Sequence, residues 1–325
     1  MSAYILRRLL QGAVKLVIIS CMVFVLTSLS GDPIAQYVGP RTSAADRERL
    51  RQDLGLNQPI FTRYTKWLAL ALQGNLGFSF SEHRPVSEML RERLPDTLLL
   101  TGMAEIVLIL ISLGVGIYQA THQYKFLDNV LTGFSFIGIS MPVFFVGLGL
   151  LLIFAVGAKD LNIRGGLWWL PYFPTGTKVW DRSSVGNWVY YMILPIATLT
   201  IIQVAGYARF VRSSVIEVMS QDYIRVARAK GLLERIVVSK HALKNAALPF
   251  VTLIGLDLPA LLGGAVVTES VFSWRGMGRL FINSAENSDF PVVMGILMMI
   301  TVAVIVVQLL VDVVYTLLDP RIKLG

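Results

Sequence analysis

The sequence has few charged residues, one cysteine and three histidines, and each shortage excludes a class of protein. Only 15% of the 325 residues are charged, whereas an ordinary soluble domain has about a quarter. The single cysteine, Cys21, allows no intrachain disulfide, so a disulfide-framed secreted module is excluded. The histidines lie far apart without the spacing of a metal site, so we predict no metal on this chain. No Walker A sequence is present either, so the chain is not expected to hydrolyse ATP by that route.

Apolar residues are abundant instead, at 54% of the chain, and they gather in six long runs. A bilayer core of about 30 Å requires roughly 20 apolar residues as a helix. None of the runs alternates with the period of two that a strand needs, so we expect an all-α polytopic membrane protein with six transmembrane helices. Pro142 and Pro195 fall inside runs and are expected to kink them. The predicted spans are Leu9–Leu29, Thr97–Tyr118, Val130–Val156, Tyr190–Ala208, Leu248–Thr268 and Pro291–Val311.

Basic residues near the spans predict the orientation of the chain. If the N-terminus is inside, the inner segments hold 13 Lys and Arg residues and the two short outer loops hold six. Arg91 and Arg93, beside the second span, argue weakly for the opposite orientation. We expect both termini on the cytoplasmic side, the first run retained as an anchor, and anionic lipid as one partner of the inner basic residues.

The spans divide the chain into three parts. Residues 1–29 hold the N-terminal segment and first span, 30–96 form an extracytoplasmic loop or cap, and 97–325 form a five-helix core with a cytoplasmic loop at 209–245.

Short helices are expected in the outer loop. Ser43 can cap a helix that runs through Asp53, and Pro59 can open a second helix with an aromatic stripe. Pro85 can open a third helix through Arg93. The loop could be a folded cap on the outer mouth, a docking or gating surface for an external partner, or a stripe in the headgroup zone.

The inner segment Arg209–Asn245 carries eight basic and three acidic residues. Ser220 is a natural N-cap and Gly231 a natural C-cap, so we predict two helices joined by a glycine turn, which form a projecting knuckle. A small apolar tip with basic flanks suits insertion into a groove on another protein. An amphipathic hairpin held against anionic lipid is the alternative. The tip residues are Ala227, Ala229, Gly231 and Leu232, and the basic flanks are Arg225, Arg228, Lys230 and Arg235.

The segment DYIRVARAKGL, with Pro249 eighteen residues after Gly231, resembles the cytoplasmic EAA loop of ABC-importer permeases. Two positions depart from that pattern. Arg225 opens the triplet where the general family has Glu-Ala-Ala, and Arg275 follows Trp274 where proline is usual. Further segments are similar to the dipeptide and oligopeptide branch, in matching order and spacing: YILRRLL, GDP at 31–33, LGLNQPIFTRY, GNLGFSFS, RLPDTLLL, ESVFSWRGMGRL and DPRIK at 319–323.

This resemblance implies the fold of a type I ABC importer transmembrane domain and a non-enzymatic permease subunit in the inner membrane of a prokaryote. It implies four partners: a second homologous permease, two cytoplasmic ATPases that hold ATP and Mg²⁺, and an extracytoplasmic binding protein that delivers di- or oligopeptides. No cofactor on this chain and no nucleic-acid partner are expected. Members of this branch also carry nickel or oligosaccharides, so those substrates stay open. The implied ATPase contact consists of Arg225, Ala227, Arg228, Ala229, Lys230, Gly231 and Leu232.

Two acids fall in the fifth predicted span. Asp257 is mid-span, where a charge is costly, so it is a candidate for contact with a peptide or the water-filled pathway, or for a hydrogen bond at the interface between permeases. Glu269, at the outer end of that span, is a candidate for an outer gate.

Three competing interpretations are kept. An ion-coupled secondary transporter would need no ATPase, and six spans without an evident internal repeat argue weakly against it. An intramembrane enzyme would need a nucleophile–base pair, and the spans contain no histidine. A scaffold in a membrane complex is compatible with the knuckle.

Overall fold

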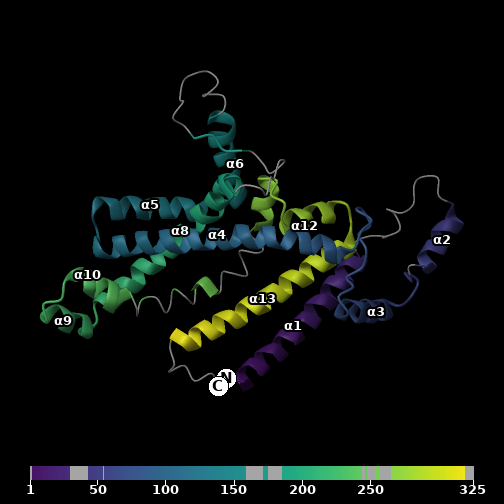
Figure 1. Cartoon of the computed structure of the whole chain (residues 1–325), viewed down its shortest axis with the longest axis horizontal. Coiled ribbons are helices and arrows are strands. Elements are labelled where there is room, and N and C mark those ends of the chain that lie inside the picture. Colours follow the sequence, from purple (N-terminus) through teal and green to yellow (C-terminus); the bar gives the residue numbers. More distant parts are fainter. Residues whose placement is uncertain are drawn as a thin grey trace. The chain divides into compact units, whose positions relative to one another are not determined.

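The computed structural model describes residues 2–29, 43–53, 55–158, 171–174, 185–243, 246, 250, 253–255 and 265–318. Within them the regular elements are helices, and the only extended pairing is an isolated bridge between Phe78 and Pro85 (Figure 1). An all-α fold is therefore confirmed. The helices are α1 (Ser2–Leu29), α2 (Ala44–Asp53), α3 (Ile60–Leu72), α4 (Val86–Thr121), α5 (Phe126–Ser140), α6 (Val143–Leu151), η2 (Leu152–Gly157), α8 (Val185–Met219), α9 (Asp222–Ala229), α10 (Glu234–Ile236), η3 (Val237–Ala242), a helix at 265–271, α12 (Met277–Glu286) and α13 (Phe290–Leu318).

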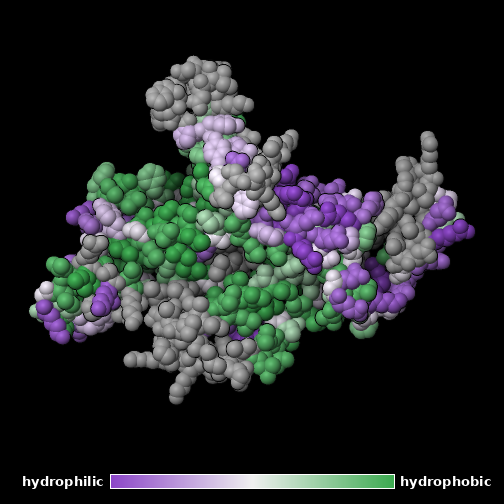
Figure 2. Space-filling model, viewed as in Figure 1, coloured by the Kyte–Doolittle hydropathy of each residue, from purple (hydrophilic) through white to green (hydrophobic). Residues whose placement is uncertain are grey.

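Four of these helices are long and apolar enough to cross a membrane, and a bent pair could supply a fifth crossing. The four are parts of α1, α4, α8 and α13, which match the first, second, fourth and sixth predicted spans. Most of the fifth predicted span, Leu248–Thr268, lies outside the described residues. Figure 2 shows hydrophobic surface along α13 and over α4 and α5, as expected of helices that face lipid.

The third predicted span is not one continuous helix. α5 ends at Ser140, α6 begins at Val143, and the two parts are bent by 106°. Pro142 causes the break, because it has no N–H to donate and its ring disfavours a helical conformation in the preceding residue. Met141 accordingly adopts the extended values φ −91° and ψ 131°. Pro195, in contrast, is accommodated inside α8.

The first two predicted helices of the outer loop are present. α2 follows Ser43, whose hydroxyl accepts a hydrogen bond from the Asp46 amide at 3.1 Å and donates one to the Asp46 carboxylate at 2.7 Å. α3 begins directly after Pro59. Local capping chemistry is therefore sufficient to predict both helices.

The third predicted loop helix does not end at Arg93. It continues through Pro95 as α4, so the outer loop and the second span share one helix of 36 residues. No glycine stands between Arg93 and Thr97 to stop the helix, and Pro95 and Asp96 do not interrupt it. Pro95 is exposed, so the carbonyl that it leaves without an intrahelical donor can be solvated there.

The described residues form two compact units, each with its own core. The first unit holds the chain up to Thr97 together with Arg275–Leu309. In this unit Asp289, which is fully buried, accepts hydrogen bonds from residues 79–81 and so joins the outer loop to the start of α13. The core comes from the beginning of α4, from α12 and from α13: Val86, Met89, Leu90, Met277, Leu280, Val292 and Ile296.

The second unit holds Leu98–Trp274 and the described residues from Leu310 onward. Gly116 lets α4 approach α8 closely, because a Cβ at this position would lie 2.6 Å from the Val211 side chain and 2.7 Å from the Ala208 carbonyl oxygen. α5 lies along α8 as well. The largest core cluster of this unit consists of Leu108, Ala120, Tyr207, Val211, Val215, Ala246 and Phe250.

Candidate coupling site

The predicted knuckle follows α8 and is formed by α9, α10 and η3 (Figure 1). Its N-cap differs from the prediction. Gln221, not Ser220, occupies that position with extended backbone angles, and the Ser220 hydroxyl donates to the Glu217 carbonyl at 2.7 Å. Ser220 lies one residue before the N-cap, and its hydroxyl instead satisfies a backbone carbonyl at the end of α8, since a serine hydroxyl readily bonds a preceding carbonyl.

The glycine turn is present as predicted. Gly231 has φ +74°, in the left-handed region that favours glycine. The amide of Gly231 donates to the Arg228 carbonyl at 2.9 Å, and the amide of Leu232 donates to the Ala227 carbonyl at 3.4 Å. These two bonds form a Schellman motif, which satisfies the last carbonyls of α9 and turns the chain sharply.

The knuckle has a small core of its own. Ile224, Ala227, Val237 and Ala242 are buried together, and Val218 from the end of α8 packs on them. Ala227 is only 6% exposed, so this member of the predicted contact set supports the surface from inside. The other six members, Arg225, Arg228, Ala229, Lys230, Gly231 and Leu232, are exposed.

An ion pair closes the turn. The Arg228 guanidinium donates two hydrogen bonds to the Glu234 carboxylate, at 3.1 Å from Nε and 2.6 Å from Nη2. This bidentate bond lowers the pKa of Glu234 and raises that of Arg228 from their ordinary values. The pair bridges the end of α9 and the start of α10 and thus restrains the angle between them.

Sequence reasoning missed the large apolar side chains on the knuckle surface. Tyr223, Val226 and Leu233 are 42%, 53% and 72% exposed, and Ile236 is also exposed. The signal was available, because residues 223 and 226 lie three apart on one face of α9, while buried residues 224 and 227 share another. The exposed face therefore combines apolar anchors with basic residues, the composition of a protein-binding surface.

The two predicted pathway acids are placed differently. Asp257 lies outside the described residues. Glu269 is fully buried in the helix at 265–271, and its carbonyl accepts a hydrogen bond from the Trp274 amide at 2.8 Å. Trp274 is itself fully buried in a cluster with Leu100 and Met192, so this carboxyl belongs to a densely packed part of the second unit. No group of His, Cys, Asp or Glu that could hold a metal ion occurs among the residues that the structure describes.

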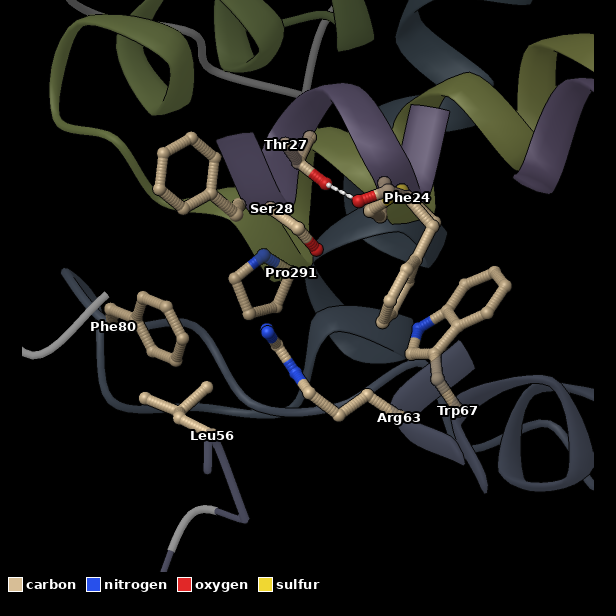
Figure 3. A pocket seen from close by; sticks show the side chains of 10 residues that line it. Phe24, Thr27, Ser28, Leu56, Arg63, Trp67, Phe80 and Pro291 are labelled. Atoms are coloured by element: carbon tan, nitrogen blue, oxygen red, sulfur yellow. Dashed lines mark hydrogen bonds between the residues drawn. The ribbon is translucent and has the colours of Figure 1, made fainter. Parts of the chain in front are cut away.

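The aromatic stripe of the outer loop packs on α1. The Tyr64 and Ser20 hydroxyls lie 2.8 Å apart, and the Phe24 ring lies 5.5 Å from the Tyr64 ring and 6.0 Å from the Trp67 ring. Beside them is a cavity of about 170 Å³ with mainly apolar walls. Figure 3 shows the Arg63 side chain pointing into it, toward Pro291, and the guanidinium lies 5.8 Å from the Phe24 ring centre.

The sequence that forms these membrane helices and the knuckle matches a known family. The profile described as "Binding-protein-dependent transport system inner membrane component" matches residues 112–324. The profile of the N-terminal part of the same membrane component matches residues 1–101. The chain belongs to this family. It is a permease subunit and a multi-pass component of an inner membrane transport system that works with a binding protein.

Curated relatives cover nearly the whole permease. It is 38% identical to the oligopeptide transport system permease protein AppB of Bacillus subtilis, over 99% of this chain and 100% of the relative. It is 36% identical to the glutathione transport system permease protein GsiC of Escherichia coli K12, over 98% of both chains. The family is one of transport permeases and not of enzymes.

The fold of the permease resembles a solved importer structure. A chain of the MetNI methionine ABC transporter in an inward-facing conformation superimposes with a TM-score of 0.53 at 17% identity. The alignment covers 71% of this permease and 96% of that chain. At this identity the similarity concerns the fold, and it agrees with the predicted type I importer transmembrane domain.

Proposed function

We propose that this permease forms half of the translocation pathway of an ATP-driven importer for di- or oligopeptides. The observation that carries the proposal is the knuckle, which is a rigid apolar and basic surface attached to a membrane helix. Relatives named as oligopeptide, peptide and glutathione permeases support the choice of peptides over nickel or oligosaccharides.

The knuckle is built to transmit motion. α8 runs without interruption for 35 residues, or about 52 Å at 1.5 Å per residue. The knuckle core includes Val218 from the end of that helix, so the two segments pack as one body. A displacement imposed on the exposed face would therefore reach the membrane part of α8, and through Gly116 it would reach α4.

We assign the exposed face as the docking site of one ATPase subunit. Tyr223, Val226 and Leu233 supply apolar anchors, and Arg225 and Lys230 flank them. A second homologous permease would present an equivalent knuckle to a second ATPase. ATP and Mg²⁺ would bind only on those subunits, and ATP binding would favour one of two pathway conformations.

The geometry of the second unit supports the predicted cytoplasmic location of the knuckle. Arg212, near the end of α8, makes an ion pair with Asp128 at the start of α5. The turn at 122–125 and the knuckle therefore belong to the same end of the second unit, as the predicted topology requires. The binding protein would deliver peptide at the opposite side.

The substrate pathway is assigned to Asp257 and Glu269. An acid within a span is costly unless it meets water, a base or a donor. A peptide amino group would satisfy Asp257, and burial of Glu269 in a packed cluster suits a gate that opens only when that cluster rearranges.

Transport by the reconstituted importer tests the proposal. The tagged permease would be purified from its native membrane, its companions identified, and the complex placed in vesicles with labelled peptides. We expect a second permease, P-loop ATPases, and peptide uptake that needs both ATP and the binding protein. Uptake driven by a proton or sodium gradient without ATP would overturn it, and competition by nickel or an oligosaccharide but not by peptides would overturn the substrate assignment.

A variant of the exposed knuckle face tests whether this face binds the ATPase. Leu233→Asp should abolish co-purification of the ATPase while leaving the permease in the membrane. Tyr124→Asp is the matched control, because Tyr124 is 83% exposed near the same end of the unit and has φ +61°, which aspartate tolerates. If Leu233→Asp retains the ATPase as well as Tyr124→Asp does, the knuckle is not the docking site.

A further inference from the structure

A second cavity, of about 270 Å³, lies where the inner ends of α4, α5 and α8 meet. Neither Glu269 nor a described residue of the knuckle is among the residues that line it. Its walls carry two arginines, three hydroxyls, an amide and an aromatic ring, so it differs from an ordinary apolar gap between helices. The lining residues are Gln119, Thr132, Ser135, Phe136, Arg209, Arg212 and Ser213.

The cavity carries one positive charge in excess. Arg212 donates to both carboxylate oxygens of Asp128, at 3.1 and 3.0 Å, so these two charges cancel. Arg209 is exposed, and among the described residues its guanidinium contacts no carboxylate and lies 5.3 Å from the Phe136 ring centre. An arginine held over an aromatic ring is oriented to receive an anion.

The cavity wall is polar beyond its two arginines. Gln119 is only 2% exposed, and its amide nitrogen donates to Asp128 and to the Thr132 hydroxyl, both at 3.2 Å. Thr132, Ser135 and Ser213 add three hydroxyl groups to the wall. A ligand that fits this cavity should therefore bring both an anion for Arg209 and hydroxyl groups of its own.

The position of the cavity indicates where such a ligand comes from. Arg209 directly follows the predicted span Tyr190–Ala208, at the level expected for lipid headgroups. Beside the cavity, Phe134, Phe136 and Ile137 of α5 are each more than half exposed. Large exposed apolar side chains of this kind suit acyl chains, whereas a water-filled peptide path would favour polar walls.

We propose that this cavity binds the headgroup of an anionic phospholipid that carries hydroxyl groups, such as phosphatidylglycerol. The phosphate would accept hydrogen bonds from Arg209 and from the nitrogen of Arg212 that does not contact Asp128. The glycerol hydroxyls would meet the hydroxyls of Thr132, Ser135 and Ser213 on the cavity wall. The lipid would bridge α5 and α8, the helix that continues into the knuckle, so its presence would stabilise the support of the coupling surface.

Native mass spectrometry of the full importer tests this proposal. The complex would be exchanged into vesicles with equal amounts of phosphatidylglycerol and phosphatidylethanolamine, extracted gently, and its retained lipids counted. We expect preferential retention of phosphatidylglycerol, reduced roughly tenfold or more by Arg209→Gln, as the loss of one charge-assisted hydrogen bond implies. Lys125→Gln, which removes a charge at the same end but outside the cavity, should retain the lipid.

A second variant tests the cavity itself. Ser135→Phe fills the space without changing the charge, so it should also displace phosphatidylglycerol while the ATPase still co-purifies. Equal retention by wild type, Arg209→Gln and Ser135→Phe would overturn the proposal. Displacement by inorganic phosphate alone, or by peptide, would also overturn it by identifying a free anion site or a pathway site. Because retention is measured without transport, these outcomes are independent of whether the importer carries peptides.

Discussion

Asp289 accepts a hydrogen bond from the Ser79 hydroxyl at 2.5 Å, although 210 positions separate the two residues. The same carboxylate accepts from the Ser81 hydroxyl at 2.6 Å and from the amides of Phe80 and Ser81 at 3.1 Å. Four donors on one buried carboxylate fix the outer loop to the start of α13. Asp289 also precedes the first turn of α13, where a negative charge favours the helix dipole.

The first prediction concerns this junction. Asp289→Ala leaves several donors unsatisfied and should destabilise the first unit by about 2–4 kcal/mol. We expect a lower apparent melting temperature of the purified permease in detergent. Glu286→Ala, at a nearby exposed position, is the control and should be neutral. An equal effect of the two variants would mean that the junction contributes nothing specific.

The second prediction concerns the knuckle turn. Gly231→Val forces a side chain into φ +74° and should reduce ATP-driven uptake strongly at normal membrane abundance. Gly74→Val is a close control, since Gly74 has φ +84° at the end of α3 and a Cβ added at either glycine would meet nothing within 4 Å. Both substitutions strain the backbone, but only the first distorts the coupling surface. Comparable uptake by the two variants would contradict the assignment.

The third prediction concerns the ion pair across that turn. Arg228→Glu should weaken ATPase coupling by charge repulsion, and the double variant Arg228→Glu with Glu234→Arg should restore much of it. Stimulation of ATP hydrolysis by loaded binding protein is the measurement. If the double variant is no better than the single one, the pair does not act through its geometry.

The pH dependence of the same pair follows from its pKa shifts. Arg228 lowers the pKa of Glu234 below its ordinary value of 4.5, so the folded state favours the charged carboxylate. The stability that the charged Glu234 carboxylate gives to the folded state is fully present above the ordinary pKa. It is lost as pH falls through the lowered pKa. Between pH 6 and 8 the pH profile of coupling should therefore have the same shape in wild type and in Glu234→Gln, and the two profiles should differ only by a constant factor. A pH slope that disappears in the variant would contradict this.

The fourth prediction concerns Asp257. Asp257→Asn removes the charge that we assign to a peptide amino group and should raise the apparent KM for peptide uptake more than it lowers the maximal rate. Asp257→Glu should restore part of the loss. If the asparagine variant instead fails to assemble with the second permease, the residue belongs to the interface between the subunits.

Much of this structure could be predicted from local sequence. The Ser43 cap, the Pro59 start of α3 and the Gly231 turn each depend on residues within a few positions, and all three are present. Apolar runs identified four long helices for the same reason, since span length is set by the bilayer.

Other features depend on distant residues and could not be predicted. The partner of Asp289 comes from another part of the fold, and the burial of Ala227 depends on how η3 folds back on α9. The continuation of α4 through Pro95 also escaped prediction, because proline is usually a helix boundary.

The break at Pro142 has a consequence for how this chain can exist in a bilayer. α5 has 15 residues, or about 22 Å of helix, less than the roughly 30 Å of hydrocarbon that a span must cross. The bend therefore falls within the apolar layer, where Ser140 to Pro142 are exposed. Lipid offers no donors for the carbonyl groups that a broken helix leaves unbonded. The break must be covered by polypeptide or must border water, so this part of the chain cannot face lipid directly.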